Sequence, residues 1–350
     1  MRCSYSENDV VVLLKDITGM IEPKSTEERE RLIQSGKHYS QMLPLESRPS
    51  EKYMEAYEAA LKSYSFDTAA AIGVVAEKIL LNKGRNMVLV SLARAGIPVG
   101  ILIKRYIMMK YKINVPHYAI SIIRGRGIDK NALKFILKRH RAGDLQFVDG
   151  WIGKGAILKE LKKDLAEFKE VSPNLAAAAD PANETELCGT HEDILIPNSC
   201  LNSTVSGLIS RTVLNDELIG ENDFHGAVYY KELEKYDISY DFINAIESKF
   251  SFDRKEQKTE YSGFKGIDEV NGIAKDFGIS DINFIKPGIG ETTRVLLRRV
   301  PWKILIKNDE MENPMISHIL RLAEEKNVVV EPCGLVNYRA CGIIKKYSDA

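Results

Sequence analysis

Apolar runs of strand length alternate with amphipathic segments of helical period through the first 250 residues, and this alternation most constrains the fold. The apolar runs are residues 87–92 (MVLVSL), 117–123 (HYAISII), 145–148 (LQFV), 175–179 (LAAAA) and 193–197 (DILIP). The segments with helical spacing are 97–111, 129–141, 156–170 and 203–214. Strands that alternate with helices predict an α/β fold with a parallel sheet covered on both faces. Ligands of such sheets bind at the carboxyl ends of the strands.

A charged stretch without apolar periodicity, KFSFDRKEQKTEYSG at 249–263, interrupts the alternation. We predict a first domain over 1–250, a linker over 251–262 and a second domain over 263–350. The first 60 residues are polar and expected to be mostly helical. In the second domain the alternation resumes as a small α/β/α unit, with a last helix expected in YRACGIIKKY.

Composition excludes several classes of protein. The formal net charge is zero, so any nucleic-acid or membrane partner must meet a local patch. No apolar run is long enough to cross a membrane, and the N-terminus lacks the order of a signal peptide. The five cysteines are scattered, which favours the cytoplasm and argues against disulfides or a zinc cluster. We predict no metal bound by the protein itself.

The stretch LQFVDGWIGKGAILKEL at 145–161 places an acid and several glycines between a strand and a helix. Its spacing fails for a P-loop, which needs GxxxxGK and then Ser or Thr, and for the dinucleotide motif GxGxxG. It resembles the phosphoribosyl-pyrophosphate (PRPP) loop of phosphoribosyltransferases. That resemblance implies that Asp149 and Gly150 hold the ribose, and that Gly153, Lys154, Gly155 and Ala156 hold the 5′-phosphate. Two departures, Gly150 for a second acid and Ile152 for a threonine, weaken the case for catalysis.

A second turn of this kind, SLARAGIPVG at 91–100, also follows a strand and precedes a helix. The backbone of Ala93, Ala95 and Gly96 could face a pyrophosphate, and Arg94 could bind it with two parallel hydrogen bonds. Arg124 and Arg126 follow the next strand and could close over a polyphosphate.

The polar stretch from 186 to 214 contains further candidates. Ser199, Cys200, Asn202, Ser203 and Thr204 are expected either to cap a helix or to line an acceptor pocket. Cys200 with His191 could form a thiol–imidazole pair, whereas the Cys188-x-x-His191 spacing could bind a metal.

Several of these motifs in order, HYSQMLPLESRPSEKYM, SLARAGIPVG, SIIRGRGID, FVDGWIGKGAI and ILIPNSCLNSTVSGLISRTVLN, resemble the bacterial family labelled cysteine protease StiP. Its N-terminal domain has been interpreted as a phosphoribosyltransferase encoded in tellurium-resistance and stress gene clusters. The resemblance implies catalysis by Asp149 and Arg94, with Mg²⁺ bound through PRPP.

The second domain resembles the PELOTA RNA-binding domain, which is related to proteins that bind kink-turn RNA. The stretches KPGIGETTRVLLRR at 286–299 and LAEEKNVVVEPCGLVNYRACG at 322–342 carry the resemblance. It implies that structured RNA is bound by Lys286, Gly290, Glu291, Arg294 and Arg298.

We therefore expect a cytoplasmic, PRPP-dependent transferase that moves ribose 5-phosphate to an unidentified base and is coupled to an RNA-binding domain. One alternative is a nucleotide-sensing RNA-binding protein with reduced catalysis. A second alternative is a cysteine protease that uses Cys200.

Overall fold

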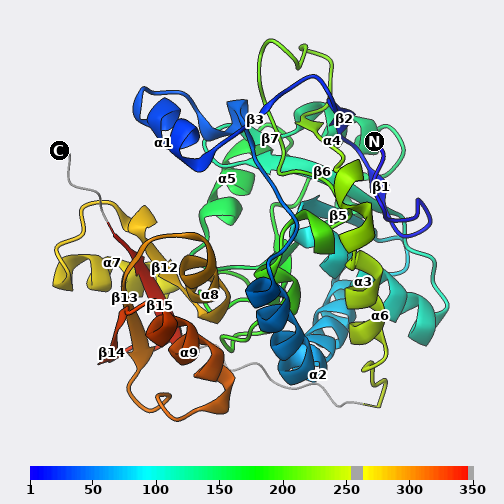
Figure 1. Cartoon of the computed structure of the whole chain (residues 1–350). Helices are drawn as coiled ribbons and strands as arrows, with labels where there is room; N and C mark the ends of the chain where they lie inside the picture. The colour runs from blue at the N-terminus through cyan, green and yellow to red at the C-terminus, as the bar shows by residue number, and fades with distance from the viewer. Residues whose placement is uncertain (254–262, 346–350) are drawn as a thin grey trace.

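A parallel sheet forms the centre of the first domain (Figure 1). The computed structural model describes residues 1–253 and 263–345, so most of the predicted linker lies outside the described residues. The strands run in the order β1 (Val11–Val12), β6 (His117–Ile123), β5 (Val88–Ala93), β8 (Leu145–Trp151), β9 (Leu175–Ala179) and β10 (Cys188–Thr190), and neighbours are parallel. A short antiparallel strand, β7 (Gly127–Ile128), pairs with β6. The predicted parallel sheet is confirmed, whereas its likeness to a phosphoribosyltransferase sheet stays a prediction.

Both faces of this sheet are covered by helices. Leu89 and Val148 point into a core shared with α2 (Glu51–Lys83) and α3 (Gly96–Tyr111), on which α6 (Ser239–Glu247) packs. Val88, Val90 and Phe147 point into a second core beneath α4 (Lys130–Leu137) and α5 (Ala156–Leu165). Since successive side chains of a strand face opposite sides, burial of both faces explains the continuous apolar runs.

Three expectations for the first domain were wrong. The first 60 residues hold, besides α1 (Thr26–Gln34) and the start of α2, the short strands β2 (Lys15–Asp16), β3 (Pro23–Lys24) and β4 (Leu43–Pro44). Residues 193–196 are a loop that leads into a 3₁₀ turn at Pro197, and 203–214 form a short 3₁₀ turn followed by irregular chain. Gly207 and Leu208 have φ of 81° and 57°, and such left-handed residues end a helix. The remaining elements are β11 (Gly226–Ala227) and the 3₁₀ turns at Tyr39–Gln41, Ala142–Asp144, Pro197–Cys200, Ser203–Val205 and Lys231–Tyr236.

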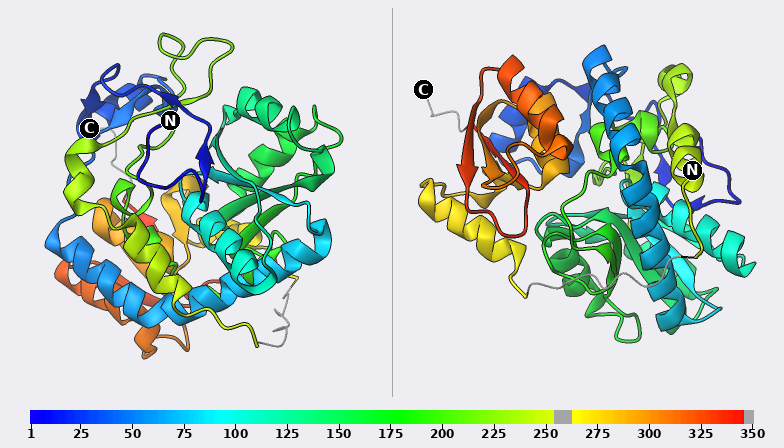
Figure 2. Two further views of the ribbon diagram at one scale, coloured as in Figure 1. Left: turned by 90° about the vertical axis from the view of Figure 1, so that its right-hand side faces the viewer. Right: turned by 90° about the horizontal axis from the view of Figure 1, so that it is seen from below.

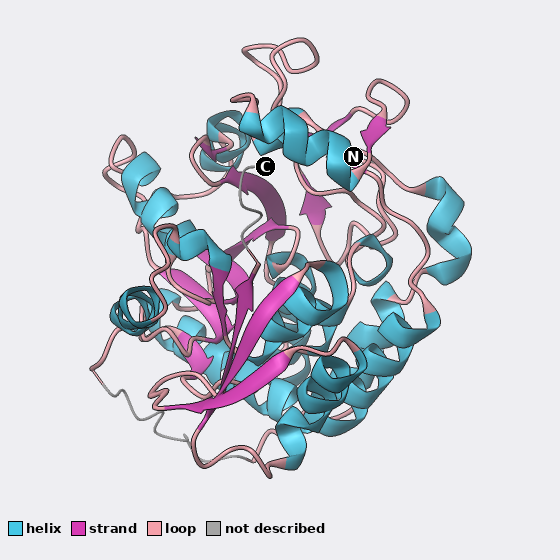
Figure 3. Cartoon of the chain, turned by 60° about the vertical axis from the view of Figure 1, so that its left-hand side comes forward, coloured by secondary structure: helices cyan, strands magenta, loops and turns pink. Residues whose placement is uncertain are grey.

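The second domain is a four-stranded mixed sheet with three helices (Figure 3). Its elements are α7 (Gly266–Asp276), β12 (Ile285–Pro287), α8 (Ile289–Arg298), β13 (Pro301–Lys307), α9 (Ser317–Glu325), β14 (Val329–Cys333) and β15 (Ala340–Ile344), with 3₁₀ turns at Ile282–Phe284 and Pro314–Ile316. The sheet order is β12-β15-β13-β14. The predicted last helix is instead the central strand β15, because a short apolar run there is buried between two strands.

The second domain lies beside α2 (Figure 2), and buried residues of both domains belong to one hydrophobic core. The Tyr53 hydroxyl of α2 donates to the carbonyl of Leu297, 2.7 Å away on α8. The buried Asp193 carboxylate accepts hydrogen bonds from the backbone N–H groups of Ile289 and Arg339, at 3.0 and 2.9 Å. No helix in the described part of the chain is long and apolar enough to cross a membrane.

Candidate active site

The edge strand β10 places a cysteine and a histidine side by side. Cys188 begins the strand, paired in register with Ala177 of β9, and His191 follows its last residue. A Cβ atom on Gly189 would overlap the carbonyl of Ala71 in α2. The strand therefore lies directly against α2, and this contact fixes the position of the cysteine.

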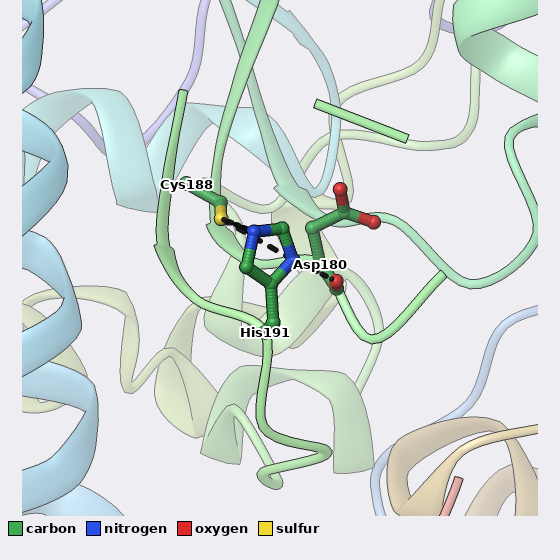
Figure 4. A group of neighbouring side chains, drawn as sticks. All are labelled: Asp180, Cys188 and His191. Atoms are coloured by element: carbon green, nitrogen blue, oxygen red, sulfur yellow. Dashed lines mark hydrogen bonds between the residues drawn. The ribbon is translucent and has the colours of Figure 1, made fainter. Parts of the chain in front are cut away.

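The Cys188 sulfur lies 3.4 Å from Nε2 of His191 (Figure 4). The other ring nitrogen, Nδ1, lies 2.9 Å from the backbone carbonyl oxygen of Asp180. A carbonyl oxygen can only accept, so Nδ1 carries the proton and Nε2 has a free lone pair. The sulfur also lies 3.7 Å from Nδ1, so it is beside the ring and not along the Nε2 lone pair, and the ring or the thiol must turn before Nε2 can take the thiol proton.

The Asp180 side chain holds the loop that leads from β9 to β10. Its carboxylate accepts hydrogen bonds from the backbone N–H groups of Glu184 and Thr185, both at 2.7 Å. Burial raises the pKa of Asp180 to about 6, against these hydrogen bonds. Potential ligand atoms of Asp180, Cys188 and His191 lie within 4.8 Å of one another, so the three could also bind a metal ion. The prediction of no protein-bound metal considered Cys188 and His191, but not Asp180 as a third ligand.

Burial keeps the cysteine unreactive in this conformation. The residue has no exposed surface, and desolvation raises the pKa of its thiol to about 12. Burial also lowers the pKa of His191, so the imidazole is neutral at physiological pH. Both groups are therefore uncharged at rest.

A cavity of about 740 Å³ reaches the histidine from outside. It is lined by Lys78, Asn82, Lys83, Gln146, Asn174, Glu184, Thr185, Glu186, Leu187 and His191. The lining includes residues 184–187 of the loop held by Asp180, but not Cys188.

The alternative thiol, Cys200, has no imidazole beside it. It is fully buried, and burial raises the pKa of its thiol to about 12. In the described part of the chain, the other histidines bond to oxygen atoms: His38 to Ser40, His117 to Ser91 and Asp9, His140 to Tyr118, His225 to Ser121, and His318 to Thr293. The structure thus pairs His191 with Cys188 and not with Cys200.

The predicted phosphate loop packs against the second domain. The Tyr338 hydroxyl donates to the carbonyl of Gly153 at 2.7 Å. Lys154 donates to the carbonyls of Ile282 and Ile285 at 2.7 and 3.0 Å. At Gly155 a Cβ atom would lie 3.0 Å from the Glu184 side chain.

The remaining predicted PRPP residues are placed as follows. Asp149 accepts a hydrogen bond from the Gly150 N–H at 2.7 Å, and burial raises its pKa to about 7. Arg94 pairs with Glu46 at 2.9 Å. Gly96 lies so close to β8 that its Cβ would be 2.5 Å from the Val148 carbonyl. Ala93 ends β5, Ala95 precedes α3, Ala156 begins α5, Arg124 donates to Asn283 at 3.0 Å, and Arg126 is exposed.

The acceptor-pocket and RNA-binding candidates face one another across the domain interface. Asn202, Ser203 and Thr204 share the lining of one cavity with Lys286, Glu291, Arg294 and Arg298. Ser199 and Cys200 are buried beneath that lining. A Cβ atom on Gly290 would lie 3.3 Å from the Ser199 hydroxyl, so this glycine permits the close approach of α8.

Comparison with known proteins corrects the predicted activity. Residues 3–247 match the family described as "Tellurite-like stress resistance cysteine protease StiP", and 264–346 match the PELOTA RNA binding domain. "Cysteine protease StiP" of Acinetobacter baylyi is 36% identical over 365 residues, covering 98% of this chain and 94% of that protein. The transferase prediction was wrong, whereas the residues assigned to PRPP and the Mg²⁺ cofactor stay untested predictions. The glycines at 153–155 were interpreted as lying beside a phosphate, whereas the structure packs them against protein. The resemblance itself is confirmed: the chain belongs to the StiP family and carries a PELOTA domain at its C-terminal end.

Proposed function

We propose that the chain is a cysteine peptidase in which Cys188 is the nucleophile and His191 its general base. The observation that carries this proposal is the 3.4 Å approach of the Cys188 sulfur to Nε2, with Nδ1 held by the Asp180 carbonyl. A nucleophile, a base and a group that orients the base are the parts that this chemistry needs. The name of the relative in Acinetobacter baylyi supports the same activity.

The proposed reaction uses these groups in two steps. Nε2 of His191 takes the thiol proton while the Cys188 sulfur attacks a peptide carbonyl carbon. The C–N bond then breaks, the amine leaves with the proton from the imidazolium, and a thioester remains on the sulfur. Water, deprotonated by the same nitrogen, attacks the thioester and releases the acid and the free thiol.

The closed conformation is a resting state in this proposal. Because the thiol has no exposed surface, a substrate carbonyl reaches it only after the loop from Asp180 to Leu187 moves. The two hydrogen bonds from Glu184 and Thr185 to the Asp180 carboxylate hold that loop in place. Protonation of Asp180 weakens them, since a neutral carboxyl accepts less strongly than a carboxylate.

Two alanine variants of the full chain test which cysteine is the nucleophile, with digestion of fluorescent casein as the activity assay. We expect Cys188→Ala to lose activity by more than about a hundredfold. The matched control is Cys200→Ala, which also removes a fully buried thiol and should retain activity. The opposite pattern would identify Cys200 as the nucleophile and refute the assignment.

We further propose that the second domain binds structured RNA through Lys286, Glu291 and Arg294 at the start of α8. The family match supports RNA binding in general. Lys286 and Arg294 supply positive charge for phosphates, and Glu291 can accept from the edge of a base. An RNA with a kink-turn should bind more tightly than a matched duplex; equal affinities would exclude kink-turn recognition.

We also propose a cytoplasmic location. All five cysteines are free thiols, which suits a reducing compartment.

A further inference from the structure

A cavity of about 640 Å³ lies between the two domains, away from the cysteine–histidine pair. One side is formed by residues of the first domain: Arg29, Pro44, Leu45, Glu46, Ser47, Arg48, Pro49, Ser50, Tyr53, Arg94, Leu201, Asn202, Ser203, Thr204 and Arg211. The other side is formed by Lys286, Glu291, Arg294, Val295, Leu297, Arg298 and Arg299. Neither Asp149 nor the loop from Gly153 to Ala156 contributes to it.

The charge of this lining is strongly unbalanced. Seven arginines and one lysine face two acids, although the whole chain has a formal net charge of zero. Both acids are already paired, since Glu46 lies 2.9 Å from Arg94 and Glu291 lies 3.2 Å from Arg294. The lining therefore carries more cations than acids.

Two half-buried arginines show this imbalance most clearly. Arg211 donates to the carbonyls of Tyr39 and Met42, and Arg298 to the carbonyl of Cys200 and the side chain of Asn202. These acceptors are neutral. In the described part of the chain, the Nε atoms of both arginines are buried and have no hydrogen-bond partner.

The electrostatics agree with this geometry. Burial, and then repulsion by neighbouring arginines, lowers the pKa of both Arg211 and Arg298 to about 10. Burying guanidinium groups without counter-charges costs folding free energy. An anion that enters the cavity would remove part of this cost, so the cavity is preorganised for negative charge.

We propose that this cavity binds a ligand with two or more adjacent phosphate groups, held by arginines of both domains. Guanidinium groups form paired, charge-assisted hydrogen bonds with phosphate oxygens, and several can converge on a chain of phosphates. A single carboxylate would neutralise only one of the lining cations. The hydroxyl of Thr204, buried in the lining without a described partner, supplies a further donor. The phosphates come either from a free nucleotide or from the backbone of RNA.

Calorimetric titrations of the full chain test the site with three probes. Inorganic tripolyphosphate and ATP represent free polyphosphate ligands, and a single-stranded RNA 20-mer represents backbone phosphates. The test variant is Arg48→Ala with Arg294→Ala, one residue from each domain. Its matched control is Lys138→Ala with Arg141→Ala, in a separate basic recess at the end of α4. We expect the test variant to lose at least about tenfold in affinity at low salt and the control less than about twofold.

The outcomes are distinct. Tripolyphosphate and ATP binding that depends on Arg48 and Arg294 supports a nucleotide ligand, and the same dependence for the 20-mer alone supports RNA phosphates. Failure of all three probes to bind, or equal losses in the test and control variants, overturns the proposal. Loss of kink-turn selectivity alone would refute the RNA function proposed above and leave the cavity site standing.

Discussion

The charge on Asp149 should destabilise the fold at neutral pH, and Asp149→Asn tests this. Burial raises the pKa of this carboxyl from 3.8 to about 7, against a hydrogen bond from the Gly150 N–H. A raised pKa means that the folded protein favours the protonated acid. The stability that the protonated Asp149 contributes is therefore complete below about pH 4 and is lost as the pH rises through 7. About three pKa units correspond to about 4 kcal/mol, and we expect about 2–4 kcal/mol because the residue keeps some exposure.

Urea unfolding followed by tryptophan fluorescence at pH 5 and pH 8 measures the effect. Asparagine keeps an oxygen for the Gly150 N–H but cannot ionise. We expect Asp149→Asn to exceed the wild type in free energy of unfolding by about 2–4 kcal/mol at pH 8 and by about 1–2 kcal/mol at pH 5. The exposed Asp216→Asn is the control and should follow the wild type. If the gain from Asp149→Asn does not grow between pH 5 and pH 8, the reasoning fails.

Two further variants and one labelling reaction test contacts near the site and at the domain interface. Gly189→Ala should destabilise the chain by more than about 3 kcal/mol, measured by urea unfolding, because the new methyl overlaps the Ala71 carbonyl, which is backbone. Asp193→Ala should cost about 2–4 kcal/mol in the same assay by leaving the buried Ile289 N–H unbonded; a loss below about 0.5 kcal/mol would refute the role of this carboxylate at the interface. Alkylation of Cys188 by iodoacetamide, followed by mass spectrometry, should still accelerate between pH 9 and pH 11, since burial raises its pKa to about 12. A plateau above about pH 9 would show an ordinary exposed thiol instead.

The parallel sheet could be predicted because strands that are buried on both faces appear in the sequence as continuous apolar runs. Residues 203–214 could not, since they have helical spacing but contain two left-handed residues, Gly207 and Leu208. The strand Ala340–Ile344 was mistaken for a helix because a short apolar run is compatible with either. Its pairing with β12 and β13 depends on contacts distant in sequence.

The candidate site was harder to predict than the fold. The Cys188-x-x-His191 spacing was visible, but it was interpreted as a weak metal motif. The group that orients His191 is the carbonyl of Asp180, a backbone atom that any residue type would supply, so it leaves no trace in the sequence. The packing of the predicted phosphate loop was missed for a related reason. Its neighbour is the hydroxyl of Tyr338, 185 residues further along the chain.

The second domain is part of the structure of the first and not an appended module. Lys154 of the first domain donates hydrogen bonds to carbonyls of the second domain. Arg298 of the second domain donates to the carbonyl of Cys200 in the first. The Asp193 carboxylate, whose burial raises its pKa to about 6, is satisfied by backbone N–H groups from across the interface. Removing residues 263–350 would leave this acid without those donors and expose the shared core. Loss of peptidase activity in such a truncation would therefore reflect unfolding as much as chemistry, and point variants of the full chain are the informative ones.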